Sequence, residues 1–230
     1  MPTYLISGGN RGLGLEFVRQ YAAEGARLIV GVRAPERADA LNRLAAVRPD
    51  HVAVHPLDVA DADSVARFRQ AVGDEPIDAL IANAGVMPAG QQFGSIDYEQ
   101  WLEALQINTL GPLRLAEAFV DNVRRGEERR MLALTSMLGS MSENRSGGYL
   151  AYRTTKAALN SAWRTLSIAL RPEGITCVLL HPGHARTDMG GPTAAVDPVE
   201  SITGLRRVIA NLSLADTGRF ITWQGEDYPW

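Results

Sequence analysis

Two side chains spaced four residues apart could share one site and carry out acid–base chemistry. Tyr152 and Lys156 lie within GGYLAYRTTKAALN, residues 147–160, and Lys156 is the only lysine in a chain that contains 22 arginines. On an α-helix, residues i and i+4 share a face, so the phenol and the ammonium would point the same way. A cation beside a phenol favours the phenolate, and we expect the Tyr152 pKa to lie about 2 to 3 units below its reference value of about 10. The pair could then transfer a proton near neutral pH.

A second tyrosine in the same stretch has a cation at the same spacing. Tyr149 is followed four residues later by Arg153, and helical geometry alone does not exclude this pair. Arginine stays protonated and presents a rigid fork, whereas lysine is a compact charge with rotatable donors that suits proton exchange. We therefore assign the chemistry to Tyr152, and we expect Tyr149 to line the substrate cleft or to pack at the start of the helix.

A glycine-rich turn near the N-terminus has the composition of a phosphate-binding loop. The segment LISGGNRGLG runs from an apolar strand into a helix and contains Gly8, Gly12 and Gly14. Glycines at such a turn let the backbone approach a pyrophosphate, and the helix N-terminus offers free N–H groups to the same anion. The spacing is G-x-x-x-G-x-G and not G-x-G-x-x-G, and glycine-rich turns also follow strands that bind no ligand. Its place between a strand and a helix nevertheless predicts a dinucleotide site.

The end of the second predicted strand indicates which dinucleotide would bind. An acidic residue about 20 positions after the glycines would bind the ribose hydroxyls of NADH, whereas an arginine there suits the 2′-phosphate of NADPH. The chain reads LIVGVRAPER, with Arg33 at this position and no acid before Glu36. Arg11, inside the glycine turn, is a second candidate for the phosphate, because guanidinium forks match phosphate geometry. These residues predict NADPH; the alternative is that Arg33 only caps an exposed strand end.

The elements that must position these residues alternate along the chain. Short apolar runs rich in β-branched residues alternate with longer stretches of helical periodicity, which predicts a parallel sheet covered by helices on both faces. The predicted strands are 4–7, 27–32, 52–57, 79–83, 131–136, 175–181 and 219–223, and the predicted helices lie near 13–24, 35–47, 61–72, 97–124, 149–171 and 198–212. No linker, repeat or low-complexity tract interrupts them, so we expect one domain over residues 1–230.

Composition argues against several other classes of protein. The net charge of −3 gives no electrostatic reason to expect nucleic acid or an anionic membrane as a partner. No apolar run reaches about 18 residues, no signal peptide precedes the first strand, and the single Cys177 cannot form an internal disulfide, so we expect a cytoplasmic protein. His181 and His184 lack the further ligands that would complete a metal site, and we expect no metal.

Together these motifs resemble those of the short-chain dehydrogenase/reductase family, over essentially all 230 residues. The glycine turn is similar to the family's TGxxxGxG with Ser7 in place of the threonine, and YRTTK matches its YxxxK pattern. Further matching segments are LDVAD at 57–61, NAG at 83–85, INTLGP at 107–112, TSMLG at 135–139 and HPGHART at 181–187. The resemblance implies a Rossmann-type doubly wound parallel sheet of about seven strands. It also implies that a single domain both binds the dinucleotide and carries the catalytic residues.

The resemblance also implies roles for individual residues. In the catalytic set Ser136 would bond the substrate oxygen, Lys156 would hold the nicotinamide ribose beside Tyr152, and Asn108 would hold a water that links Lys156 to solvent. NADPH would contact Gly8, Asn10, Arg11, Gly12, Leu13, Gly14, Arg33, Asp58, Val59, Asn83, Ala84, Gly85, Tyr152, Lys156, Pro182, Gly183 and Thr187. The substrate would contact Met137, Leu138, Tyr149 and Met189.

The predicted substrate residues are mostly apolar, which favours hydrophobic carbonyl compounds over anionic ones. Arg145 or Arg186 could reverse this preference by reaching the cleft. The segment between Thr187 and the helix near 198 is short, which predicts a small lid.

Two departures from the family pattern indicate a particular subgroup of the family. Tyr152 lies sixteen positions after Ser136, a wider spacing than the family usually has, and the C-terminal GRFITWQGEDYPW lacks the common ending. Both features resemble a subgroup that contains the carbonyl reductase sniffer and the bacterial C-factor proteins. This implies an NADPH-dependent reductase of aldehydes, ketones or quinones with Tyr152 as general acid. The alternative is a signalling or regulatory protein that binds the cofactor without relevant turnover, and either could be a homodimer or a homotetramer.

Overall fold

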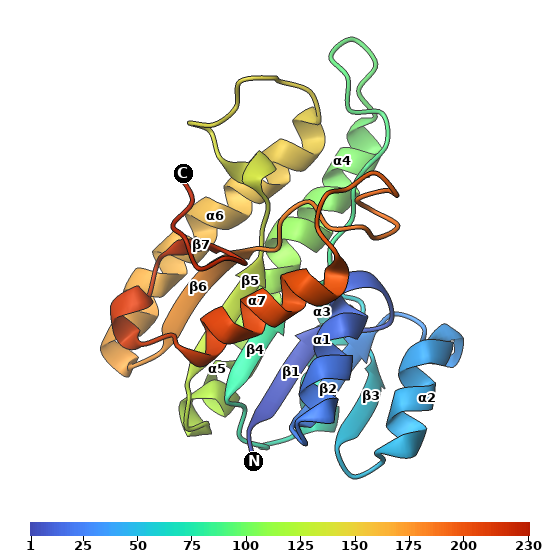
Figure 1. Cartoon of the computed structure of the whole chain (residues 1–230), viewed down its shortest axis with the longest axis vertical. Coiled ribbons are helices and arrows are strands. Elements are labelled where there is room, and N and C mark those ends of the chain that lie inside the picture. The colour runs from blue at the N-terminus through green and yellow to red at the C-terminus, as the bar shows by residue number, and fades with distance from the viewer.

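Seven parallel strands form one sheet, with helices on both of its faces (Figure 1). The computed structural model describes residues 1–230, and its strands are β1 (Thr3–Ser7), β2 (Arg27–Val32), β3 (Val52–Pro56), β4 (Ala79–Ala82), β5 (Arg130–Leu134), β6 (Thr176–His181) and β7 (Phe220–Thr222). They pair in the order β3-β2-β1-β4-β5-β6-β7. The order reverses between β1 and β4, and such a switch point leaves a crevice at the carboxyl ends of the strands. The predicted doubly wound, single-domain fold is confirmed.

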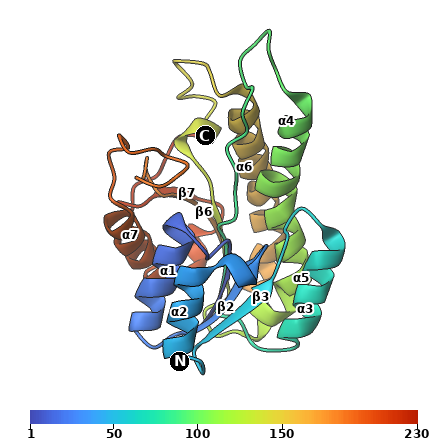
Figure 2. The same ribbon diagram turned by 90° about the vertical axis from the view of Figure 1, so that its right-hand side faces the viewer.

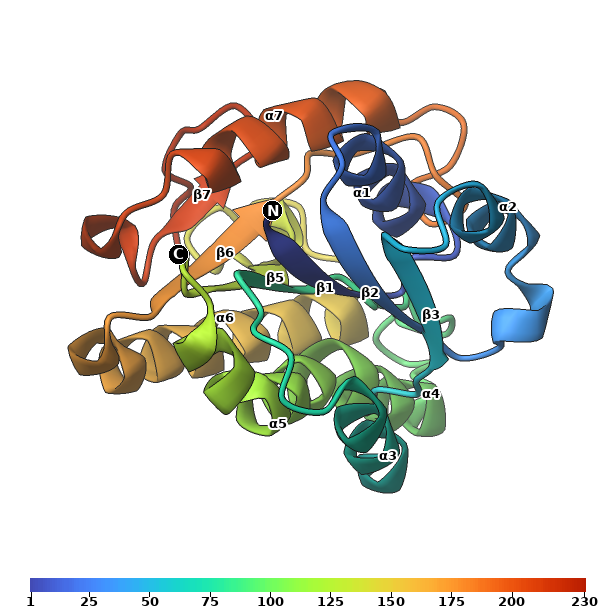
Figure 3. The same ribbon diagram turned by 90° about the horizontal axis from the view of Figure 1, so that it is seen from below.

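The helices form two layers, which Figure 3 shows on opposite sides of the sheet. One layer consists of α1 (Gly12–Ala23), α2 (Asp39–Val47) and α7 (Pro198–Ala210), and the other of α3 (Ala62–Val72), α4 (Tyr98–Leu105), α5 (Gly111–Arg125) and α6 (Leu150–Leu170). Strand residues alternate between the two cores: Tyr4 and Ile6 pack with α1 and α7, while Leu5 packs with the opposite layer. None of the helices combines the length and the apolarity needed to cross a bilayer.

The helix predicted at 97–124 contains an irregularity that the sequence pattern does not show. α4 passes into a π-helical turn at Gln106–Leu110 before α5 continues to Arg125. Turns of this kind occur often at functional sites. Asn108 lies in this turn and is fully buried. Most of the other predicted elements agree closely with the structure, and a short 3₁₀ turn at Pro35–Arg37 precedes α2.

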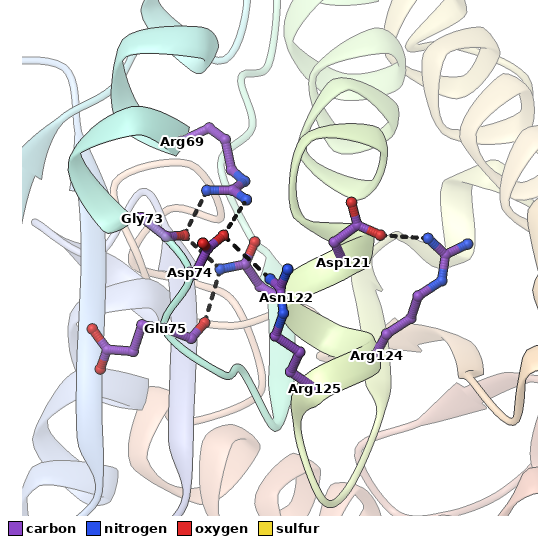
Figure 4. Close-up of polar contacts among 8 residues, drawn as sticks. All are labelled: Arg69, Gly73, Asp74, Glu75, Asp121, Asn122, Arg124 and Arg125. Carbon is purple, nitrogen blue, oxygen red and sulfur yellow. Dashed lines mark hydrogen bonds and ion pairs between the residues drawn. The ribbon is translucent and has the colours of Figure 1, made fainter.

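Polar contacts hold the end of the sheet that lies away from the crevice (Figure 4). The fully buried Asn122 of α5 donates to the carbonyl oxygens of Gly73 and Glu75 at 2.9 and 2.8 Å, which fixes the α3–β4 connection against α5. At the opposite end, the loops that follow β4 and β5 rise side by side (Figure 2). The predicted site residues belong to this second end of the molecule.

Candidate active site

A cleft of about 550 Å³ opens at the carboxyl ends of the strands, around the switch point between β1 and β4. Its walls come from the segments after β1, β2, β3, β4, β5 and β6, together with the first turns of α6. Most of the predicted residues line it: Gly8, Asn10, Arg11, Gly12, Leu13, Gly14, Arg33, Asp58, Val59, Asn83, Ala84, Gly85, Tyr152, Lys156, Pro182, Thr187 and Met189. The fold therefore brings these separate motifs to one place.

Some predicted residues are not part of the walls of this cleft. They are Ser136, Asn108, Gly183, Met137, Leu138 and Tyr149. Ser136 directly follows Thr135, which does line the cleft. Met137 and Tyr149 are 44% and 54% exposed, so they lie at the surface beyond it. Gly183 packs against Trp223 instead of facing the cleft.

The glycine turn lets the backbone face the cleft without side chains in the way. A Cβ on Gly14 would collide with the carbonyl oxygen of Gly8, and Gly12 has a φ of 52°, which favours glycine. α1 begins at Gly12 with no side-chain cap from Arg11, so its first N–H groups stay free for an anion. These features fit a diphosphate.

Ser7 joins the ends of β1 and β4 on the two sides of the switch point. Its Oγ accepts hydrogen bonds from the N–H groups of Asn83 and Ala84, both at 3.1 Å. In return Asn83 Nδ2 donates to the carbonyl oxygens of Ser7 and Gly8 at 3.0 and 3.1 Å. The NAG segment is thereby braced against the glycine turn, and serine performs this task in place of threonine.

Three arginines lie along the part of the cleft beside the end of β2. Arg33 and Arg37 both line it, and the Arg33 guanidinium makes no ion pair or hydrogen bond with the chain. Arg11 is instead paired with Asp188 at 3.2 Å, an exposed contact between the glycine turn and the segment after Thr187. Arg37 was not predicted, and its position four residues after Arg33 was the only signal for it.

Tyr152 and Lys156 lie on the same face of α6 and are only 7% and 5% exposed. The Lys156 Nζ donates to the carbonyl oxygen of Leu134 at 2.8 Å and lies 5.8 Å from the centroid of the Tyr152 ring. Burial lowers the pKa of Lys156 to about 8. Burial also raises the pKa of Tyr152 to about 12, although the neighbouring Ser136 hydroxyl opposes this change. The predicted lowering of the Tyr152 pKa is therefore wrong, because desolvation outweighs the opposing effect of the hydrogen bond with Ser136.

The competing pair of Tyr149 and Arg153 does not form. The Arg153 guanidinium donates to the carbonyl oxygens of Gly147 and Gly148 at 3.0–3.3 Å and so clamps the loop before α6. Tyr149 precedes the helix in a left-handed conformation, with φ 50°, and its ring is exposed. Tyr152 is therefore the tyrosine that lies beside the buried lysine.

Asn108 connects the loop after β4 to α6. Its Nδ2 donates to the carbonyl oxygen of Val86 at 2.9 Å and to Thr155 Oγ1 at 3.1 Å, while its Oδ1 accepts from the N–H of Val86 at 2.8 Å. Because both N–H donors are used, the side chain could bind the predicted water only through Oδ1.

The segment after β6 forms a small loop that is closed at its base. Ala185 bridges to Val196, and the Arg186 guanidinium donates to Asp197 at 3.1 Å and to the carbonyl oxygens of Ala194 and Ala195. Arg186 is therefore engaged at the base of the loop and does not face the cleft. Arg145 is exposed in the loop before α6.

Comparison with known proteins agrees with this arrangement. Residues 2–196 match a family model described as short chain dehydrogenase. The C-signal protein of Myxococcus xanthus is 46% identical over 155 residues, which cover 67% of this chain and 93% of that protein.

Two solved structures resemble the whole chain. The carbonyl reductase Sniffer of D. melanogaster has a TM-score of 0.92 and 31% identity, and the match covers 100% of both chains. The NADPH-bound carbonyl reductase from chicken fatty liver has a TM-score of 0.94 and 32% identity, covering 100% of this chain and 99% of that one. With its characteristic motifs gathered around one cleft, this chain belongs to the short-chain dehydrogenase family.

Proposed function

We propose that this protein is an NADPH-dependent carbonyl reductase that converts aldehydes, ketones or quinones to alcohols. The observation that supports this most directly is the buried pair of Tyr152 and Lys156, with the Ser136 hydroxyl beside the phenol. A protein that only binds cofactor has no need of all three groups. Two structural neighbours are carbonyl reductases, one of them with NADPH bound, which supports the same reaction and cofactor.

The proposed chemistry divides between the cofactor and the chain. NADPH, when bound, supplies the hydride that adds to the carbonyl carbon. The Tyr152 phenol, with a pKa of about 12, stays protonated at neutral pH and can donate its proton to the developing alkoxide oxygen. The Ser136 hydroxyl would donate a hydrogen bond to the same oxygen. This bond would strengthen as negative charge develops there.

Lys156 would return the proton that Tyr152 gives up. Its pKa of about 8 lies close to neutral pH, so the ammonium can exchange protons with water under ordinary conditions. Its Nζ lies 5.8 Å from the centroid of the Tyr152 ring, a distance at which a buried positive charge stabilises a nearby phenolate. Lys156 would also contact the ribose hydroxyls next to the nicotinamide.

Arg33 and Arg37 support NADPH over NADH. Both line the cleft beside the end of β2, where the adenosine 2′-phosphate would lie, and the guanidinium of Arg33 is free to bind it. Arg11 would join them by leaving Asp188. That ion pair is exposed, with side-chain exposures of 63% and 77%, so breaking it costs little.

The surroundings of the site support a hydrophobic carbonyl substrate. Met189 lines the cleft, and Met137 and Tyr149 expose apolar surface in the segments after β5. Arg186 is held by Asp197, which removes one cation that could select an anionic substrate. A saturable preference for a carboxylated carbonyl compound would contradict this part of the proposal.

A homodimer or homotetramer is also proposed, through the layer of α4, α5 and α6. Tyr98 and Leu102 on α4 and Ile168 on α6 are 63–65% exposed, although they are large and apolar. Light scattering coupled to size-exclusion chromatography would report a monomer if these surfaces do not associate.

The second candidate function is signalling with a bound nicotinamide cofactor and no relevant turnover. It is favoured by the 46% identity to a protein named C-signal. Measuring NADPH oxidation by the purified protein with a panel of aldehydes, ketones and quinones distinguishes the two candidate functions. Carbonyl-dependent oxidation of NADPH supports the reductase, whereas tight cofactor binding without turnover on any member supports the alternative.

A further inference from the structure

The helix that presents Tyr152 and Lys156 begins without a cap of its own. The residue before α6 is Tyr149, with φ 50° and ψ 39°, and its side chain makes no capping hydrogen bond. The first N–H groups of a helix have no acceptor within the helix. In α6 two of the residues that bear them, Ala151 and Tyr152, are only 1% and 7% exposed. These donors therefore need partners from another part of the chain.

Gln91, in the loop after β4, provides one of these partners. Its Oε1 accepts a hydrogen bond from the backbone N–H of Tyr152 at 2.8 Å, although the two residues are 61 positions apart. Its Nε2 donates to the carbonyl oxygen of Pro88 at 2.6 Å. The two contacts define which end of the amide is oxygen, because the opposite orientation would set an NH₂ group against the Tyr152 N–H. Gln91 thus does for α6 what an N-cap side chain does for other helices.

A second set of contacts fixes the same backbone one turn further along α6. Thr155 Oγ1 donates to the carbonyl oxygen of Tyr152 at 2.8 Å and accepts from Asn108 Nδ2. Asn108 is in turn bonded to both backbone polar groups of Val86, at the start of the loop that contains Gln91. The N–H and the C=O of Tyr152 are therefore both held by side chains that connect to this one loop.

We propose that Gln91 is a positioning residue for the reaction, which caps α6 from outside the helix and so keeps the Tyr152 phenol in place beside Ser136 and Lys156. This inference rests on the proposed role of Tyr152. A displacement of about 1 Å at a reacting group can cost about 100-fold in rate. Loss of this single acceptor should therefore affect catalysis more than cofactor binding, since the cofactor contacts many other residues.

The test compares three variants with the full-length wild type. Gln91→Met keeps the length of the side chain but removes the acceptor, and Gln91→Glu keeps an oxygen for the Tyr152 N–H. Gln92→Met is the matched control, because Gln92 is the next residue, is exposed and makes no side-chain hydrogen bond. We expect Gln91→Met to lower kcat by about 10- to 100-fold while the Kd for NADPH stays within about twofold. Gln91→Glu should recover most of this loss, and Gln92→Met should match the wild type.

Amide hydrogen exchange gives a readout that does not depend on activity. In Gln91→Met the Tyr152 amide should exchange at least about tenfold faster, with no such change in Gln92→Met. Unchanged exchange at Tyr152 overturns the inference, and so does faster exchange with a normal kcat, which would leave Gln91 as a structural cap only. A wild type without carbonyl turnover refutes the proposed function instead, and the exchange rate at Tyr152 still decides whether Gln91 caps α6.

Discussion

Lys156 connects the catalytic helix to the end of β5: its Nζ donates to the carbonyl oxygen of Leu134 at 2.8 Å while lying 5.8 Å from the centroid of the Tyr152 ring. Lys156 is only 5% exposed, so the size of its side chain and the direction of its donors are constrained as well as its charge. Gly85 is nearby, where even an added Cβ would approach Nζ to 3.8 Å. A side chain of the same charge but different shape should therefore serve poorly here.

Lys156→Arg is expected to lower kcat/KM by about 10²- to 10⁴-fold, the scale of lost acid–base assistance. Arginine keeps the positive charge and the helix propensity, so the variant should still fold. Its planar fork, however, stays protonated and cannot exchange a proton near neutral pH. Steady-state reduction measured together with a thermal melt checks this, and near-normal activity in a folded variant would refute the role of a compact ammonium.

The pH dependence of kcat should report the same group. Burial lowers the pKa of Lys156 to about 8, so the ammonium is present below that pH and is lost above it. The Tyr152 pKa of about 12 keeps the phenol protonated over the whole working range. We expect kcat of the wild type to fall as the pH rises through about 8, and the residual activity of Lys156→Arg to lack this decline. A wild-type profile that stays flat to pH 10 would contradict the assignment.

Lys156→Met should be inactive but more stable than the wild type at neutral pH. The folded pKa of about 8 lies below the model value of 10.5. Below pH 8 both folded and unfolded states are protonated, and the folded state bears the full cost of a buried charge, on the order of 3 kcal/mol. Between these two pKa values only the unfolded state binds the proton, so the wild type gains stability as the pH rises.

Methionine also loses the hydrogen bond to Leu134, so the net gain should be about 1–3 kcal/mol at pH 7, or roughly 2–10 °C in Tm. The difference from the wild type should shrink towards pH 10. Thermal melts at both pH values check this. A Lys156→Met variant less stable than the wild type at pH 7 would show that other interactions of the ammonium fully offset the cost of burying its charge.

Cofactor choice should depend on the arginines beside the end of β2. Each charge-assisted hydrogen bond to the 2′-phosphate contributes about 1.5–3 kcal/mol, so NADPH should bind at least about tenfold more tightly than NADH. Arg33→Asp should reverse the preference and Arg37→Ala should weaken it. Arg43→Ala, at an exposed arginine of α2 outside the cleft, is the control. Isothermal titration showing equal or tighter NADH binding to the wild type would overturn the NADPH proposal.

Much of the site could be predicted because its motifs are local in the sequence. A strand that runs into Gly8, Gly12 and Gly14 and then into a helix predicts a dinucleotide site, and the spacing of Tyr152 and Lys156 specifies a shared helix face. The alternation of strands and helices likewise predicts the parallel sheet covered on both faces. These inferences needed no knowledge of contacts between distant residues.

The contacts that sequence patterns do not report join residues far apart in the chain. Gln91 reaches Tyr152 over 61 positions, and Arg11 reaches Asp188 over 177. The π-helical turn around Asn108 lies inside an unbroken amphipathic pattern, so periodicity gave no sign of it. The sequence predicted the wrong direction for the Tyr152 pKa shift for a similar reason. The shift is caused by burial, which depends on the packed fold and not on the residues adjacent in the sequence.

The most direct test of the proposed reaction is the rate of carbonyl-dependent NADPH oxidation by the wild type, Tyr152→Phe and Tyr149→Phe under identical conditions. Tyr152→Phe removes the proton donor alone, so its kcat should fall by about 10²- to 10⁴-fold while the Kd for NADPH and the melting temperature stay close to those of the wild type. Tyr149→Phe, at an exposed position, should change mainly the KM for the carbonyl compound. If Tyr152→Phe retains near-normal kcat, or if Tyr149→Phe is the more damaging change, Tyr152 is not the general acid.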